Sequence, residues 1–167
     1  MRVSIISIAL MTILIAGNAF AQGAQVPFAG LELGKDTKVE VTADTLGIDQ
    51  QSGKAVFSGN VVIGIQVMRL TADKVEVVYS NKSAGAVGPI STLYATGNVV
   101  FTNGAEAAEG NEARINLETN IIVMTGDVIL TQGQNALSAQ KLRIDLKAGT
   151  ALLEGRVQTI FQTGTSE

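Results

Sequence analysis

The chain has 167 residues with no cysteine and no histidine, and its 15 acidic residues outnumber 12 basic ones, giving a formal net charge of −3. This composition excludes disulfide stabilisation and the common acid–base, thiol and metal chemistries that use these two residue types. Without a basic run nucleic acid is not an expected partner, and the length suits a single domain.

The first 21 residues are typical of a secretory signal peptide. Two leading residues that include one arginine precede an apolar run over 3–16, and Ala19-Phe20-Ala21 is a small-x-small cleavage motif. Because the apolar run is shorter than the ~20 residues that a spanning helix needs, we expect export with cleavage after Ala21. A flexible N-terminal segment over 22–36, a folded domain over 37–162 and a short tail over 163–167 should follow.

The rest of the chain contains four copies of one repeat unit. Each unit opens with a small residue followed by alternating apolar residues, and it closes with Gly, a usually polar residue and Val. The openers are Ala43, Ala72, Gly110 and Ala139, and the closing triplets are Gly59-Asn60-Val61, Gly97-Asn98-Val99, Gly126-Asp127-Val128 and Gly155-Arg156-Val157. The second unit is longer because it contains the turn-rich stretch 81–89, which we expect to be a loop between two strands.

Apolar residues alternate strictly on both sides of each closing glycine. Around Gly59, for example, they are Ala55, Phe57, Val61 and Ile63. A period of two predicts strands with one buried face, and turn-forming residues near 49–54, 118–120 and 147–150 predict hairpins. A glycine at the same place in four strands would weaken them unless it marks a bulge or bend, so we expect a curved all-β sheet.

Three architectures satisfy this pattern: an open jelly roll, a closed barrel and a short β-solenoid. The inward-facing set is mostly aliphatic, which suits either a compact core or a groove for flexible aliphatic chains. Carboxylates that could be imagined as a catalytic pair or a calcium site lie at repeat edges and turns, where solvated acids are common. They are Asp44, Asp73, Glu109, Glu112 and Asp127. We therefore expect no enzyme activity, no metal and no cofactor.

Three segments of the repeat resemble a known family. They are Val39-Glu40-Val41-Thr42-Ala43-Asp44, Ala55-Val56-Phe57-Ser58-Gly59-Asn60-Val61 and Leu70-Thr71-Ala72-Asp73-Lys74-Val75-Glu76-Val77. Together with the later Gly-polar-Val triplets they make residues 37 to 162 similar to the LptA/OstA family of periplasmic lipopolysaccharide-transport proteins. The resemblance implies a slightly twisted open β-jelly roll, built from repeated antiparallel hairpins, that holds the acyl chains of lipopolysaccharide in an apolar groove.

The same resemblance implies a carrier or bridge that moves lipopolysaccharide from the inner to the outer membrane. Its implied partners are the lipid A part of lipopolysaccharide, further copies of the chain joined end to end, an inner-membrane LptC-like component and an outer-membrane LptD-like component. Transport of this kind needs no reaction, because each CH₂ kept from water contributes ~0.8 kcal/mol. Two alternatives are a structural β-repeat filament or scaffold without lipid binding and a membrane-anchored relative that keeps its N-terminal segment.

Two sets of residues carry these expectations. The interior set expected to contact lipid is Val39, Val41, Leu46, Ile48, Phe57, Val61, Ile63, Val75, Val77, Val99, Phe101, Ile115, Leu117, Met124, Val128, Leu130, Leu142 and Ile144. The edge strands expected to meet partners contain Val39 and Val41 at one end, and Val157, Ile160 and Phe161 at the other.

Overall fold

The structure is a computed structural model that describes residues 23–31, 33, 37–49, 54–80 and 88–160. The predicted signal peptide, most of the 81–89 loop, Phe161 and the tail lie outside these residues. The described strands are β1 (Ala24–Pro27), β2 (Val39–Thr42), β3 (Thr45–Asp49), β4 (Lys54–Ile65), β5 (Met68–Tyr79), β6 (Ile90–Asn103), β7 (Glu106–Asn116), β8 (Ile121–Gln132), β9 (Asn135–Asp145), β10 (Thr150–Glu154) and β11 (Gln158–Ile160). In this part of the chain no helix has the length and apolar character needed to cross a membrane.

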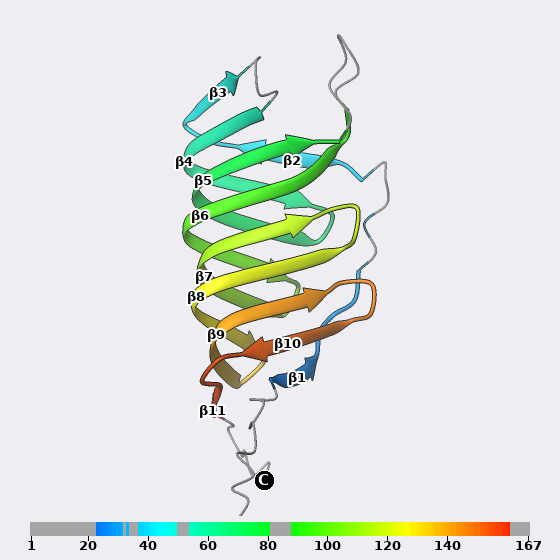
Figure 1. The fold of residues 1–167 in the computed structure, drawn as a ribbon, viewed down its shortest axis with the longest axis vertical. Helices are drawn as coiled ribbons and strands as arrows, with labels where there is room; N and C mark the ends of the chain where they lie inside the picture. Colours follow the sequence, from blue (N-terminus) through cyan, green and yellow to red (C-terminus); the bar gives the residue numbers. More distant parts are fainter. Residues whose placement is uncertain (1–22, 32, 34–36, 50–53, 81–87, 161–167) are drawn as a thin grey trace, which may run out of the picture.

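All strands belong to one antiparallel sheet in the order β1-β10-β9-β8-β7-β6-β5-β4-β2, with β3 also paired to β4 and β11 to β9. From β4 to β10 each strand pairs with its successor in the chain, so the sheet grows as a row of hairpins (Figure 1). β5 ends at Tyr79 and β6 begins at Ile90, which confirms that the extra residues of the second unit fall between two strands.

The long strands bend where the sequence repeats its glycine. Gly59, Gly97 and Gly126 have φ values of 80°, 80° and 82°. The residue after each also has a positive φ, and the strand register shifts there. These bulges fold the sheet onto itself along one side, which we call the corner, so that two halves face each other. The predicted curvature is confirmed, and the fold is the predicted open β-jelly roll.

At each glycine of the corner a side chain from the neighbouring part of the sheet fills the space that a Cβ of the glycine would need. Asp44 lies against Gly59 and Asp73 against Gly97. Their carboxylates accept hydrogen bonds of 2.9 Å from the amides of Asn60 and Asn98. The structure thus gives Asp44 and Asp73 a place in the corner of the fold.

The third corner carries the same two side-chain types with their places exchanged. Asn111 lies against Gly126, and Asp127 follows that glycine. Asp44 and Asp73 therefore correspond to Asn111, while Asn60 and Asn98 correspond to Asp127. Each of these three repeats thus places one amide and one acid at the corner, in either order.

This exchange leads to a first prediction. Asn98→Asp should lower the free energy of unfolding by about 1 kcal/mol, because two carboxylates then meet at an exposed site. Adding Asp73→Asn should restore most of the loss by recreating the arrangement of the third corner. Urea denaturation followed by circular dichroism measures both values, and a double variant no more stable than Asn98→Asp would contradict the assignment.

The two halves bury one continuous apolar face between them. Directly paired residues form rows across the sheet, such as Ala55, Val77, Leu93, Ile115, Ile122, Ile144, Ala151 and Val26. A row on the opposite half contains Val41, Ile63, Leu70, Phe101, Ala108, Leu130 and Leu137. Most of these side chains are buried almost completely, so the interior is a long apolar layer that follows the stack of strands.

Candidate functional site

The apolar interior has a mouth opposite the corner. The hairpin turns at 104–105 and 133–134 end one half of the sheet, and we call them, with the strand residues beside them, the first lip. The turns at 117–120 and 146–149 end the other half and form the second lip. Because the corner strands are continuous and the lips are separate turns, the interior can open only between the lips or at the two ends of the sheet.

Most of the predicted interior residues lie where the alternation places them. Those that are at most about 1% exposed are Val61, Ile63, Val75, Val77, Val99, Phe101, Ile115, Met124, Val128, Leu130, Leu142 and Ile144. Val39, Val41, Phe57 and Leu117 are partly buried against this core. The side chains are therefore brought together on one face, and contact with lipid remains a proposal for all of them.

Leu46 and Ile48 differ from the rest of this set because they are 53% and 69% exposed. Both lie on β3, which within the described part of the chain pairs with β4 alone. They lie opposite Phe57 and Ala55 in register, so they point to the interior face. Among the described residues the other side of β3 has no strand partner, and the apolar face therefore continues into solvent at this end.

The predicted partner edges lie at the two ends of the sheet. Among the described residues β2, with Val39 and Val41, pairs only with β4, and β11 pairs only with β9; Ile160 on β11 is 72% exposed. Val157 lies between β10 and β11 and packs partly on the core. Each end therefore presents strands with one unpaired side.

Several residues of the segment predicted to be flexible, 22–36, contact the sheet in the structure. β1 pairs with β10, and residues 28–31 continue along the mouth between the two lips (Figure 1). Phe28 and Leu33 are only 4% and 5% exposed. We call residues 28–31 and Leu33 the strap. Its apolar side chains enter the core, and its backbone has hydrogen-bond partners on both lips.

Sequence reasoning missed the strap residues. Phe28, Leu31 and Leu33 stand in a short stretch with Pro27 and Gly30, outside the repeat, and such a stretch is typical of a linker. The only signal was local: three large apolar residues within six positions beside otherwise small or polar ones. It gives no indication of which strands the segment contacts.

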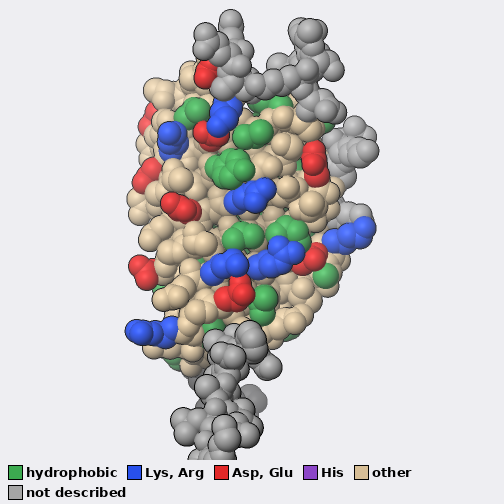
Figure 2. All heavy atoms as spheres, viewed as in Figure 1, with side chains coloured by type: hydrophobic (Ala, Val, Ile, Leu, Met, Phe, Trp, Pro, Cys, Tyr) green, Lys and Arg blue, Asp and Glu red, His purple; other side chains and the backbone are tan. Residues whose placement is uncertain are grey.

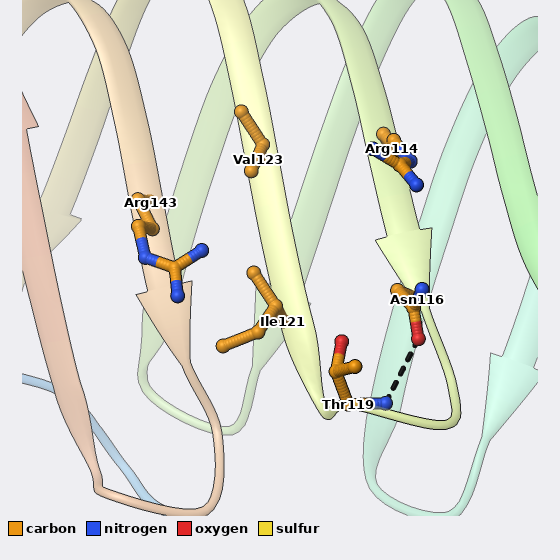
Figure 3. A pocket seen from close by; sticks show the side chains of 6 residues that line it. All are labelled: Arg114, Asn116, Thr119, Ile121, Val123 and Arg143. Atoms are coloured by element: carbon orange, nitrogen blue, oxygen red, sulfur yellow. Dashed lines mark hydrogen bonds between the residues drawn. The ribbon is translucent and has the colours of Figure 1, made fainter.

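The outer face is polar by comparison. Figure 2 shows Lys, Arg, Asp and Glu side chains mixed with apolar ones over the strands nearest the viewer. A shallow hollow there is lined by Arg114, Asn116, Thr119, Ile121, Val123 and Arg143 (Figure 3). Arg114 lies over the ring of Tyr94, 5.7 Å from its centre. The two guanidinium groups lie on either side of the β8 residues, at a solvated surface.

Electrostatic interactions of the outer face are local ion pairs. Lys54 Nζ lies 2.7 Å from Glu76 Oε1, and this hydrogen bond with the carboxylate raises the pKa of Lys54 above its ordinary value. Among the described residues no three acidic side chains gather in a way that could hold a metal ion. The feature that distinguishes the molecule chemically is thus its apolar interior and mouth.

A curved antiparallel sheet of bent hairpins around an apolar interior defines the class of open β-jelly rolls. Residues 40–150 match the family described as "LptA/(LptD N-terminal domain) LPS transport protein". The chain belongs to this family, as its repeated motifs predict.

The proteins similar to the chain include one curated relative and one solved structure. An uncharacterized protein of Rhizobium meliloti is 31% identical over 115 residues, which cover 66% of this chain and 61% of that protein. The chain thus spans less than two thirds of the length of this curated relative. The crystal structure of LptH, the LptA homologous periplasmic component of the lipopolysaccharide transport device of Pseudomonas aeruginosa, superposes with a TM-score of 0.67. It is 16% identical, covering 77% of this chain and 97% of that one, and shows the shared fold.

Proposed function

We propose that this protein is a periplasmic carrier or bridge for lipopolysaccharide, holding the acyl chains in its apolar groove on the way from the inner to the outer membrane. The observation that carries the proposal is the continuous interior face of aliphatic side chains from β2 at one end to β1 at the other. At ~4.8 Å per strand this face extends on the order of 40 Å. Each buried CH₂ of a ligand contributes ~0.8 kcal/mol, so retention needs no specific polar contact.

The groove has to open for such a ligand. Ile122, Met124 and Leu142 have no surface accessible to water in the structure. An acyl chain must therefore enter by separating the two halves of the sheet, and the corner bulges supply the line about which the halves turn. The sugars of the ligand stay in water outside the mouth, because the interior face of the described residues is almost entirely apolar.

The partners in this proposal are further copies of the chain and LptC-like and LptD-like components at the two membranes. Unpaired backbone groups on β2, β3 and β11 can extend a neighbouring sheet by strand addition. The exposed Leu46 and Ile48 would then continue the apolar face of one copy into the next. An end-to-end arrangement joins the grooves into one path.

Photo-crosslinking tests lipid binding directly. A small diazirine amino acid placed at Met124 should give lipopolysaccharide adducts in cells that make this lipid, whereas the same group at Val123 should not. These neighbours on β8 point to opposite faces, so they differ in orientation but not in position along the groove. Ile115 and the adjacent Asn116 provide a second pair. Folded protein without adducts at Met124 and Ile115 would instead favour a structural filament or scaffold.

End-to-end association gives another prediction. Ile48→Asp should lower self-association at least tenfold, because it places a charge on the apolar face that a second copy covers. Val67→Asp is a matched control: Val67 is 68% exposed, close to the 69% of Ile48, but lies in the turn between β4 and β5. Sedimentation velocity over a concentration series measures the effect, and equal association of both variants would contradict this interface.

A further inference from the structure

The strap joins the two lips by hydrogen bonds made on both sides. On the first lip, Ala29 N donates to Glu106 Oε2 (2.7 Å) and Ala29 O accepts from Asn103 Nδ2 (2.8 Å). On the second lip, Phe28 N donates to Gly149 O (3.0 Å) and Leu31 N to Leu146 O (2.8 Å). The strap therefore spans the mouth and holds the two halves of the sheet together.

Apolar strap side chains occupy the interior below this crossing. The rings of Phe28 and Phe101 stack with centres 6.3 Å apart, and both residues are almost fully buried. Phe101 belongs to the interior row on the half of the sheet that ends at the first lip. Phe28 and Leu33 thus fill the side of the groove where an aliphatic ligand would contact it, while Ala29 and Gly30 face solvent.

The way the strap is attached makes it separable from the sheet. Neighbouring strands of the sheet, such as β9 and β10, are joined by regular pairing of their backbones. On the first lip, in contrast, the strap is held by side chains. There Gln132 Nε2 donates both to Pro27 O, just before the strap, and to Glu106 Oε1, each at 2.7 Å. On the second lip Leu33 N donates to the side-chain oxygen Oδ1 of Asn120 at 2.7 Å. Water at the mouth can replace each of these bonds at a net cost of only about 1 kcal/mol.

Buried polar residues support the same assignment. Of the three buried polar residues among those described, Asn103 and Asn120 both bond to the strap backbone. Asn103 is 5% exposed and Asn120 is 7% exposed, because the strap covers both side chains. Once the strap leaves, both side chains can form hydrogen bonds with water instead. The two lips are therefore stable in the open state as well as in the closed one.

We propose that the strap is a displaceable lid: Phe28 and Leu33 occupy the groove in the absence of lipid, and acyl chains enter sideways through the mouth by displacing them. This inference rests on the proposed lipid-carrying function. It adds the route by which lipid enters the groove and the strap side chains that compete with lipid for it. The strap then prevents an empty groove from exposing its apolar interior, and it is replaced by a ligand of similar chemistry.

A reversible bridge between strap and first lip tests the lid. The chain has no cysteine, so Ala29→Cys with Glu106→Cys introduces the only two thiols, at positions linked by a hydrogen bond. Joining them with a short reducible bis-methanethiosulfonate reagent should lower capture of purified lipopolysaccharide at least tenfold, and reduction should restore it. Lys141→Cys with Glu154→Cys is the control, because these paired residues of β9 and β10 do not cross the mouth.

The outcomes separate the lid from the carrier function. If the unbridged variants and the unchanged protein capture no lipopolysaccharide, the proposed function itself fails. If they capture it and the bridged Ala29–Glu106 pair captures as much, the lid is wrong and lipid enters elsewhere. A loss on bridging both pairs equally would mean that the reagent acts on the protein in general, and it would also overturn the lid.

A second variant should strengthen lipopolysaccharide binding if the strap is a lid, but should weaken it or leave it unchanged if the strap is purely structural. Phe28→Ala removes the side chain that competes with lipid at Phe101, and we expect several-fold tighter binding of lipopolysaccharide despite a less stable fold. Val26→Ala, on β1 just before the strap, should weaken the core without this gain. Unchanged or weaker binding by Phe28→Ala would overturn the competition.

Discussion

Gly97→Ala should lower the free energy of unfolding by about 3 kcal/mol. A Cβ at this position would lie 2.3 Å from Oδ2 and 2.9 Å from Cβ of Asp73. The carboxylate can rotate away, but the Cβ of Asp73 cannot, so the backbone of β5 or β6 must shift and the bond to Asn98 is lost. The positive φ of Gly97 adds a penalty of about 1–2 kcal/mol for a residue with a side chain.

Gly104→Ala is the matched control. Gly104 also has a positive φ (64°), but a Cβ there meets nothing within 4 Å. We expect this variant to lose only the backbone penalty of about 1–2 kcal/mol. Urea denaturation followed by far-ultraviolet circular dichroism compares the two, and equal losses would mean that the close approach at the corner contributes nothing.

The corner shows what the sequence could and could not predict. The repeated glycine indicated a bend, because a glycine is unfavourable in a strand without one, and the structure confirms it. The partner of each glycine could not be deduced, because Asp73 and Gly97 meet only after β5 and β6 pair around the insertion. The exchange of acid and amide in the third repeat is visible in the sequence, but it has meaning only once the register is known.

The interior could be predicted from the sequence, whereas the strap could not. Strict alternation was sufficient to place Ile115, Met124 and Leu142 on one face, since a period of two leaves no choice of side. The strap depends on contacts between residues 73 to 121 positions apart, such as Phe28 with Phe101 and Phe28 with Gly149. No local pattern encodes contacts of that separation, and a short segment containing proline and glycine reads as a linker.

Leu130→Ala should lower the free energy of unfolding by about 2–5 kcal/mol, because Leu130 is fully buried and its removal leaves a cavity. The adjacent Ile129 on β8 is 42% exposed on the outer face, and Ile129→Ala should change stability by about 0.5 kcal/mol or less. The comparison by urea denaturation reports the state of the groove in solution. Small and similar losses would show that the interior is already open to water without a ligand.

The same pair of variants distinguishes a filled groove from a merely packed core. A ligand that binds only the folded state stabilises it by mass action, and acyl chains lying in the groove would also occupy part of the cavity left at position 130. We therefore expect saturating lipopolysaccharide to reduce the loss of unfolding free energy caused by Leu130→Ala. The loss caused by Ile129→Ala should stay the same. If the loss at position 130 is the same with and without lipopolysaccharide, the acyl chains do not lie beside β8. Because Leu130 shares the interior row of Phe101, on which Phe28 stacks, that result would also contradict displacement of the strap at this level of the groove.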